Sequence, residues 1–152
     1  MTDSIDRLRT ILRLRKRDLD RCEQAAAAAR KGVAAAEERE GEAARACTRA
    51  AAACEQALAQ RLRQPADAMV QLHCRVVAAR ADSMRRLRDQ ARDALQEARG
   101  AADGMRREWL RAQARHDVIS SELERAIRRL QRHISRKADD EARPLGRPVA
   151  TA

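Results

Sequence analysis

The stretch RLRQPADAM, residues 61–69, decides the fold because it holds the one proline between residues 3 and 143. Proline lacks an N–H and breaks a helix more reliably than any other residue. Pro65 disfavours helix at Gln64 and suits the first turn of a following helix. Asp67 adds a negative charge near that helix start, where it is favourable. The stretch therefore predicts a turn at about 63–66 between two long uninterrupted segments.

The segment before the turn follows a heptad repeat. With Ile5 at position a, fourteen of the seventeen a and d positions up to residue 61 are apolar, and the exceptions are charged. A seven-residue apolar period is typical of helices that pack along a seam. The segment after the turn has the same repeat, and its apolar stripe slips toward a 3.6 period near residue 123. A short turn between two such helices predicts an antiparallel pair.

We therefore expect an all-α fold, a long two-helix antiparallel coiled-coil hairpin. It is a single unit over residues 1–138, with helices at about 4–62 and 67–138, and a disordered C-terminal tail over 139–152. Folding about residue 65 predicts that facing residues have numbers summing to roughly 128–132. This register places Glu40 opposite Arg88, and Arg15 near Asp117. The seam residues expected to carry the packing are Ile5, Leu12, Leu19, Cys22, Val33, Cys47, Cys54, Val77, Met84, Leu95, Met105, Trp109, Ile119 and Leu123.

The composition agrees with this fold class. The chain has one Trp, no Phe and no Tyr among 152 residues, and its apolar content is mostly Ala. Alanine lines a close helix–helix seam but cannot fill a thick globular interior. Abundant Ala, Glu, Arg and Leu is the compositional mark of long helices.

The cysteines raise a separate question, because two of them stand seven apart in ACTRAAAACE (residues 46–55). Cys47 and Cys54 both fall at position a, about 10.5 Å apart along a helix axis, too far for one metal ion to bridge. Packing as small apolar residues is the favoured interpretation. A disulfide between Cys54 and Cys74 under oxidation, or a metal site there with His73, is the alternative.

The sequence gives no pattern that indicates catalysis or a cofactor. Three histidines are spread over about sixty residues, and no phosphate-binding loop, nucleophile elbow or paired carboxylate occurs. The expectation is a protein that is not an enzyme and binds no cofactor or metal. No run of about twenty apolar residues and no secretory signal is found, which favours the cytosol.

Charge is unevenly distributed along the chain. Residues 1–21 carry a surplus of three positive charges and residues 106–137 a surplus of six, out of a net +10. A hairpin brings these two lengths together, so nine of the ten net charges are expected at its open end. Acidic residues alternate with the basic ones there. A solvated helix face laced with salt bridges and a surface for an acidic protein partner both remain open.

The chain resembles the central-stalk proteins of flagellar and type III secretion export machinery (FliJ/YscO type). The resemblance lies in the opening IDRLRTILRLRKRDLDRCEQAAAAARKGVAAAEE, the proline-containing turn, and the segment RREWLRAQARHDVISSELERA. It covers the chain to about residue 138. It implies a bacterial protein, of a flagellar or a virulence system, that sits in the pore of a hexameric secretion ATPase and promotes its activity. Such proteins also contact the export-gate membrane protein, and some bind export chaperones.

The resemblance implies a location in the cytoplasm at the inner-membrane export apparatus, with contact to the membrane only through partners and no specific nucleic acid. Residues expected to meet carboxylates of the ring are Arg9, Arg13, Lys16, Arg17, Arg125, Arg129 and Arg132. The alternative is a generic coiled-coil scaffold or a basic nucleic-acid-associated protein.

Overall fold

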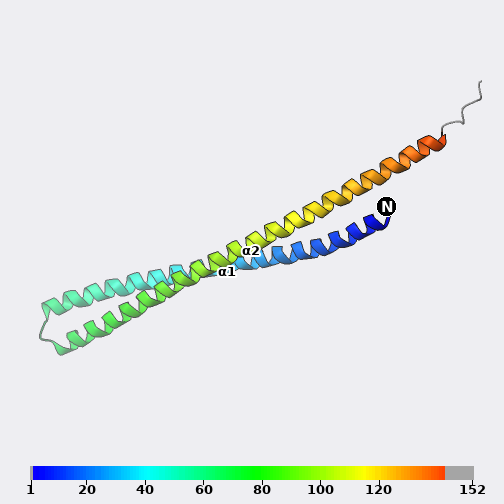
Figure 1. The fold of residues 1–152 in the computed structure, drawn as a ribbon. Coiled ribbons are helices and arrows are strands. Elements are labelled where there is room, and N and C mark those ends of the chain that lie inside the picture. The colour runs from blue at the N-terminus through cyan, green and yellow to red at the C-terminus, as the bar shows by residue number, and fades with distance from the viewer. Residues whose placement is uncertain (1, 143–152) are drawn as a thin grey trace, which may run out of the picture. The chain divides into compact units, whose positions relative to one another are not determined.

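The computed structural model describes residues 2–142 and contains two helices, α1 (Thr2–Arg63) and α2 (Ala68–Ala142). The described residues form no strand. The fold is all-α, a two-helix hairpin, as the heptad pattern predicts (Figure 1). α1 has 62 residues and α2 has 75.

The packing divides the hairpin into two compact units. The turn unit comprises residues 24–107 and includes the turn itself. The terminal unit comprises the described residues up to Glu23 and those from Glu108 onward. Each unit contains one length of α1 and one length of α2, and each is described by itself below.

The turn is closed by Asp67, which acts as the N-terminal cap of α2. One Asp67 carboxylate oxygen accepts hydrogen bonds from the backbone N–H groups of Met69 (2.8 Å) and Val70 (3.3 Å). A side-chain oxygen at this position satisfies N–H groups that have no partner within the helix. Pro65 lies in the turn and not in the first turn of α2, and its carbonyl accepts a hydrogen bond from the Gln71 amide at 2.8 Å.

The two helices meet along the expected heptad positions. Every a and d position of α1 is at least partly buried except Arg61. From Val77 to Leu130 in α2, every such position is at least partly buried except Met105, whose exposed fraction is 39%. Most of the buried side chains are small, since six of the eleven buried apolar residues are alanine. No large side chain of the described residues is completely buried.

The register in the turn unit is fixed by three cross-helix contacts. The Cys74 thiol donates to the carbonyl of Ala57 at 3.0 Å, and Arg99 pairs with Glu37 at 2.9 Å. Arg88 lies 3.9 Å from the sulfur of Cys47. Residue numbers rise on one helix as they fall on the other, which makes the pair antiparallel. Ala57 and Cys74 sum to 131, within the expected range of 128–132, whereas Cys47 and Arg88 sum to 135 and Glu37 and Arg99 to 136, above it.

Two predicted seam ion pairs are not formed. Arg88 pairs with its neighbour Asp89 at 2.6 Å and not with Glu40, and Arg15 pairs with Asp18 at 3.7 Å and not with Asp117. These side chains are partly exposed, so a carboxylate on the same helix is nearer than one across the seam. The expected cross-seam pairs therefore give no support to the register.

The end of α2 also differs from the expectation. The helix continues to Ala142, so residues 139–142 are helical and not part of a tail. No proline stands between Pro65 and Pro144, and the Lys137–Glu141 pair at 3.9 Å spans one helical turn near the end of α2. The rest of the expected tail, residues 143–152, lies outside the described residues.

Candidate protein-binding surface

The terminal unit places its basic side chains outside a seam of larger aliphatic residues. Leu12 and Leu19 of α1 and Trp109, Ile119 and Leu123 of α2 are partly buried. Arg9, Arg13, Lys16 and Arg17 occupy heptad positions e, b, e and f of α1, away from that seam, and all four are exposed. Three further cations of the expected surface are exposed on α2: Arg125, Arg129 and Arg132.

The overall charge is not concentrated in the terminal unit as the sequence suggested. Between residues 2 and 142 the terminal unit has fifteen basic and twelve acidic residues, a net +3, while the turn unit has sixteen and eleven, a net +5. The surplus of nine belongs to residues 1–21 and 106–137, and it falls to three over the terminal unit because the bounds of that unit differ. Arg106 and Arg107 belong to the turn unit, and Asp139, Asp140 and Glu141 extend α2 in the terminal unit.

What distinguishes the terminal unit is local charge density. Residues 7–17 of α1 contain six basic and no acidic residues, and residues 125–137 of α2 contain six basic and no acidic residues. We call these lengths the α1 basic run and the α2 basic run. All seven expected partner-binding residues lie in one of them.

Within the α1 basic run, the acids that flank it neutralise some of the cations. Arg9 pairs with Asp6 at 3.1 Å, and Lys16 pairs with Asp20 at 2.9 Å. Arg13 only donates to the Thr10 hydroxyl, at 3.4 Å. Neither Arg13 nor Arg17 has an ion pair within 4.0 Å among residues 2–142, so both guanidinium groups keep their charge available.

The α2 basic run is also only partly neutralised. Glu122 is shared, since Arg125 lies 2.7 Å and Arg129 3.9 Å from its two oxygens. Arg128 pairs with Glu124 at 3.5 Å. Arg132 donates to the backbone carbonyl of Arg128 at 3.3 Å and has no carboxylate partner in the described part of the chain.

The geometry brings α1 cations together with a histidine of α2. Leu12, Arg13, Lys16, Arg17 and His116 line one open groove of about 390 Å³. His116 is partly buried, and its Nδ1 lies 3.1 Å from an oxygen of Asp117. An apolar floor edged by several cations suits a carboxylate-bearing side chain with an apolar neighbour.

The seven expected residues do not form a single cluster. His116 shares a groove with Arg13, Lys16 and Arg17, and Arg125 lies nine residues farther along α2, so the α2 basic run begins beyond this groove, toward the N-terminal end of α1. The two runs therefore follow one another along the terminal unit. Arg128 and Arg136, which line a groove of about 380 Å³ with Arg132, also belong to this surface.

Sequence reasoning missed His116, Arg128 and Arg136 as members of this surface. The i, i+4 spacing of Arg128, Arg132 and Arg136 was a usable signal, since it places three guanidinium groups on one helix face. His116 occupies an a position and was expected only in the seam.

Within the α1 basic run, the pKa of Lys16 is shifted by its neighbour Asp20. The hydrogen bond from Lys16 to Asp20, reinforced by the charge of that carboxylate, raises the pKa of Lys16 above its ordinary value. Lys16 therefore stays charged throughout the physiological range.

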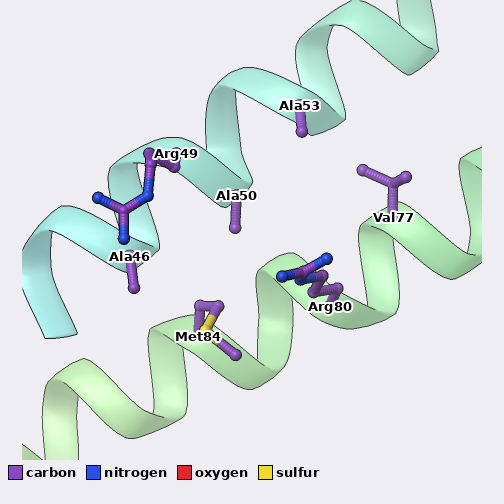
Figure 2. Close-up of a pocket in the computed structure, with 7 residues that line it drawn as sticks. All are labelled: Ala46, Arg49, Ala50, Ala53, Val77, Arg80 and Met84. Carbon is purple, nitrogen blue, oxygen red and sulfur yellow. The ribbon is translucent and has the colours of Figure 1, made fainter.

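The turn unit has a groove of a different character. Ala46, Ala50 and Ala53 of α1 face Val77 and Met84 of α2 across a space of about 310 Å³, with Arg49 and Arg80 at its sides (Figure 2). Five of the seven residues that line it are apolar, and three of these are alanines. We read it as a gap left by small side chains in the seam.

The cysteines are arranged as packing residues. Cys47 and Cys74 are buried, Cys22 and Cys54 are partly buried, and all four are free thiols. Cys74 lies against Ala57, one layer nearer the turn than the expected position opposite Cys54. Among residues 2–142, no three His, Cys, Asp or Glu side chains stand close enough to hold a metal ion.

Neither of the described helices has a stretch long and apolar enough to cross a membrane. No protein-family model matches this chain, and no curated protein or solved structure matches it.

Proposed function

We propose that this chain is the non-enzymatic central stalk of a flagellar or type III secretion export ATPase complex. In this proposal the terminal unit enters the hexameric ATPase ring and promotes ATP hydrolysis. The chain also links the ring to the export-gate membrane protein at the cytoplasmic face of the inner membrane, and export chaperones are further candidate partners.

The observation that carries the proposal is the pair of acid-free basic runs on a two-helix hairpin. A ring pore lined by carboxylates attracts these runs and orients the hairpin as it enters. Arg13, Arg17 and Arg132 make the strongest candidates for ring contact because no carboxylate of residues 2–142 neutralises them. The resemblance of the sequence to central-stalk proteins supports the same assignment.

A coiled-coil scaffold that binds nucleic acid is the second candidate, favoured by the same basic runs. Clustered arginines attract any polyanion, and such binding falls steeply with salt. Against it stands the lack of stacking side chains, since the chain has no Phe or Tyr and its one Trp, Trp109, is partly buried in the seam.

The test is a triple reversal, Arg9→Glu, Arg13→Glu and Arg17→Glu, in the full chain. These side chains are exposed and outside the seam, so the helices should stay folded. The measurements are co-purification with the secretion ATPase of the same organism and the rate of ATP hydrolysis with and without the chain. We expect the triple variant to lose binding and to leave hydrolysis at its basal rate.

The matched control is Arg30→Glu, Arg45→Glu and Arg49→Glu, which makes the same charge change at exposed positions of the turn unit. It should bind and stimulate like the parent. Equal loss in both variants would indicate a response to net charge alone. Stimulation that survives the terminal-unit reversal, or salt-sensitive DNA binding without any ATPase effect, contradicts the proposal.

A further inference from the structure

The hairpin tip, residues 56–81, exposes large apolar side chains that the seam does not use. Val70, Cys74 and Val77 pack with Ala57 and form the seam at this end. Five other large apolar residues of the tip point away from it and are exposed to 48–84%: Leu58, Leu62, Met69, Leu72 and Val76. The first turns of α2 are therefore apolar on two faces.

The exposure is greatest where the chain turns. Leu62 is 84% exposed and Met69 is 71% exposed, whereas Leu58 and Leu72, farther from the turn, are 48% and 52% exposed. The tip thus ends in its most accessible apolar side chains. An exposed apolar patch of this kind marks a contact site more often than scattered single residues do.

These side chains lie on more than one side of the tip. Leu58 and Leu62 occupy heptad positions e and b of α1, while Met69 and Val76 both occupy c of α2. In an antiparallel pair, e positions flank e positions and g positions flank g positions, so the two groups lie on opposite sides. A single helix of a protein partner would cover one group and leave the other in water.

The tip is also positively charged. It contains four arginines and a single acidic residue, Asp67, whose carboxylate is occupied by the N-terminal cap of α2. Arg61, Arg63 and Arg75 are exposed and have no ion pair within the described residues. Like charge opposes the pairing of two copies of this tip.

Hydrogen bonds fix the backbone of the tip that carries the exposed apolar side chains. Three sets of hydrogen bonds lie within the tip: the Asp67 cap, the bond from the Gln71 amide to the Pro65 carbonyl, and the bond from the Cys74 thiol to the Ala57 carbonyl. The tip is therefore preorganised, so little further ordering opposes binding.

We propose that the hairpin tip binds an anionic lipid surface directly, with Leu62 and Met69 inserted among the acyl chains and Arg61, Arg63 and Arg75 at the phosphates. A fluid interface can surround a convex tip on all sides, which a single protein groove cannot. Arginine stems reach along apolar surface while their guanidinium groups stay at headgroup level. This contact requires no partner protein and is independent of any ATPase binding.

The test uses flotation of the full chain with vesicles of phosphatidylcholine alone or mixed equally with phosphatidylglycerol. We expect binding only to the mixed vesicles. Leu62→Ser with Met69→Ser should reduce partition about a hundredfold, since each exposed leucine-sized side chain contributes on the order of a tenfold change when buried. Replacing Arg61, Arg63 and Arg75 by Gln should cost about fivefold for each arginine.

Matched controls separate the tip from the basic runs of the terminal unit. Leu14→Ser with Val118→Ser removes exposed apolar residues of similar size there, and it should float like the parent. For insertion, Leu62→Trp is compared with Leu14→Trp in vesicles of brominated lipid. The tryptophan introduced at position 62 should be quenched, and the one at position 14 should not.

Three outcomes would overturn the proposal. One is flotation of the tip serine variant at the parent level. Another is equal quenching at positions 14 and 62. A third is no binding to mixed vesicles, including the case in which the tip instead captures an acidic protein or a second copy.

Discussion

The turn unit and the terminal unit use the same heptad repeat with different side chains. In the turn unit the buried positions are mostly Ala and Cys, with Leu95 the largest among them. Among the described residues of the terminal unit only Ile5 and Ala112 are buried, while Leu12, Leu19, Trp109 and Ile119 stay partly exposed. Small side chains let helices approach until the seam closes, whereas large ones hold them apart and leave their own edges in water. The more apolar seam is therefore not the better buried one.

The largest expected effect is on the free energy of unfolding, when one leucine from each unit is replaced by alanine. Leu95→Ala removes a side chain that is 8% exposed in the turn unit and should lower the free energy of unfolding by about 3 kcal/mol. Leu12→Ala, at a partly buried position of the terminal unit, should cost about half as much. Leu87→Ala, at a residue 50% exposed on α2, is the control and should cost almost nothing. Urea unfolding followed by circular dichroism measures all three, and equal costs for Leu95 and Leu12 would remove the contrast between the units.

A disulfide can test the closeness of the seam in the turn unit. Because the Cys74 sulfur lies 3.0 Å from the Ala57 carbonyl oxygen, Ala57→Cys in a Cys54→Ala background should oxidise to a 57–74 crosslink. Closing a loop of this length should raise the free energy of unfolding by about 3 kcal/mol or slightly less. Mass spectrometry and urea unfolding under oxidising and reducing conditions provide the measurement. Two results together would show that the register is shifted. The parent would form a Cys54–Cys74 bridge, and the Ala57→Cys variant would form no 57–74 bridge.

The glycines of the turn unit sharpen the comparison further. A methyl group added at Gly32 or Gly100 would meet no atom within 4 Å, so neither glycine permits a close approach of the two helices. Gly32→Ala and Gly100→Ala should each raise the free energy of unfolding by about 0.5–1 kcal/mol through helix propensity and reduced chain entropy. A loss of stability in either variant would reveal a tight contact that this packing lacks. If stability rises while ATPase stimulation falls, the glycines serve as a point of flexibility.

The smallest effect concerns Lys16 in the terminal unit. Its pKa is raised first by the hydrogen bond to Asp20 and then by the charge of that carboxylate, so Asp20→Asn should lower the pKa toward the ordinary value of 10.5. A lysine whose pKa is raised in the folded state increases the free energy of unfolding at pH values below its unfolded pKa. This contribution is lost as the pH rises through the folded pKa. The Lys16–Asp20 pair is largely exposed, so unfolding at neutral pH should barely change. NMR titration of the Lys16 side chain measures the shift, and Asp6→Asn should leave it unaltered.

The fold could be predicted from the sequence because two strong signals agree, a sustained heptad and a lone proline in a turn-forming stretch. The heptad determines which face of each helix is buried, but it tolerates a slip of one layer, and this is why Cys54 was placed opposite Cys74. It also says nothing about where long charged side chains reach, so the pairs of Glu40 with Arg88 and Arg15 with Asp117 were wrong. Carboxylates on the same helix were nearer in both cases.

The candidate surface was predictable only in part. The basic residues are visible in the sequence, but His116 joins them only because α2 brings it level with Arg13 and Arg17. The apolar tip was missed because Leu58, Leu62 and Met69 look like ordinary helix formers until the seam is known not to use them. The charge of each unit could not be predicted because the sequence does not mark the boundary that assigns Arg106 and Arg107 to the turn unit.

The most direct test of the account asks which unit touches the ATPase ring. A photocrosslinking amino acid replaces Leu14, 54% exposed within the α1 basic run, or Leu62 at the hairpin tip. Each variant is assembled with the hexameric secretion ATPase, irradiated and analysed for adducts. We expect ATPase adducts from position 14 and none from position 62. Adducts from position 62 alone would contradict it.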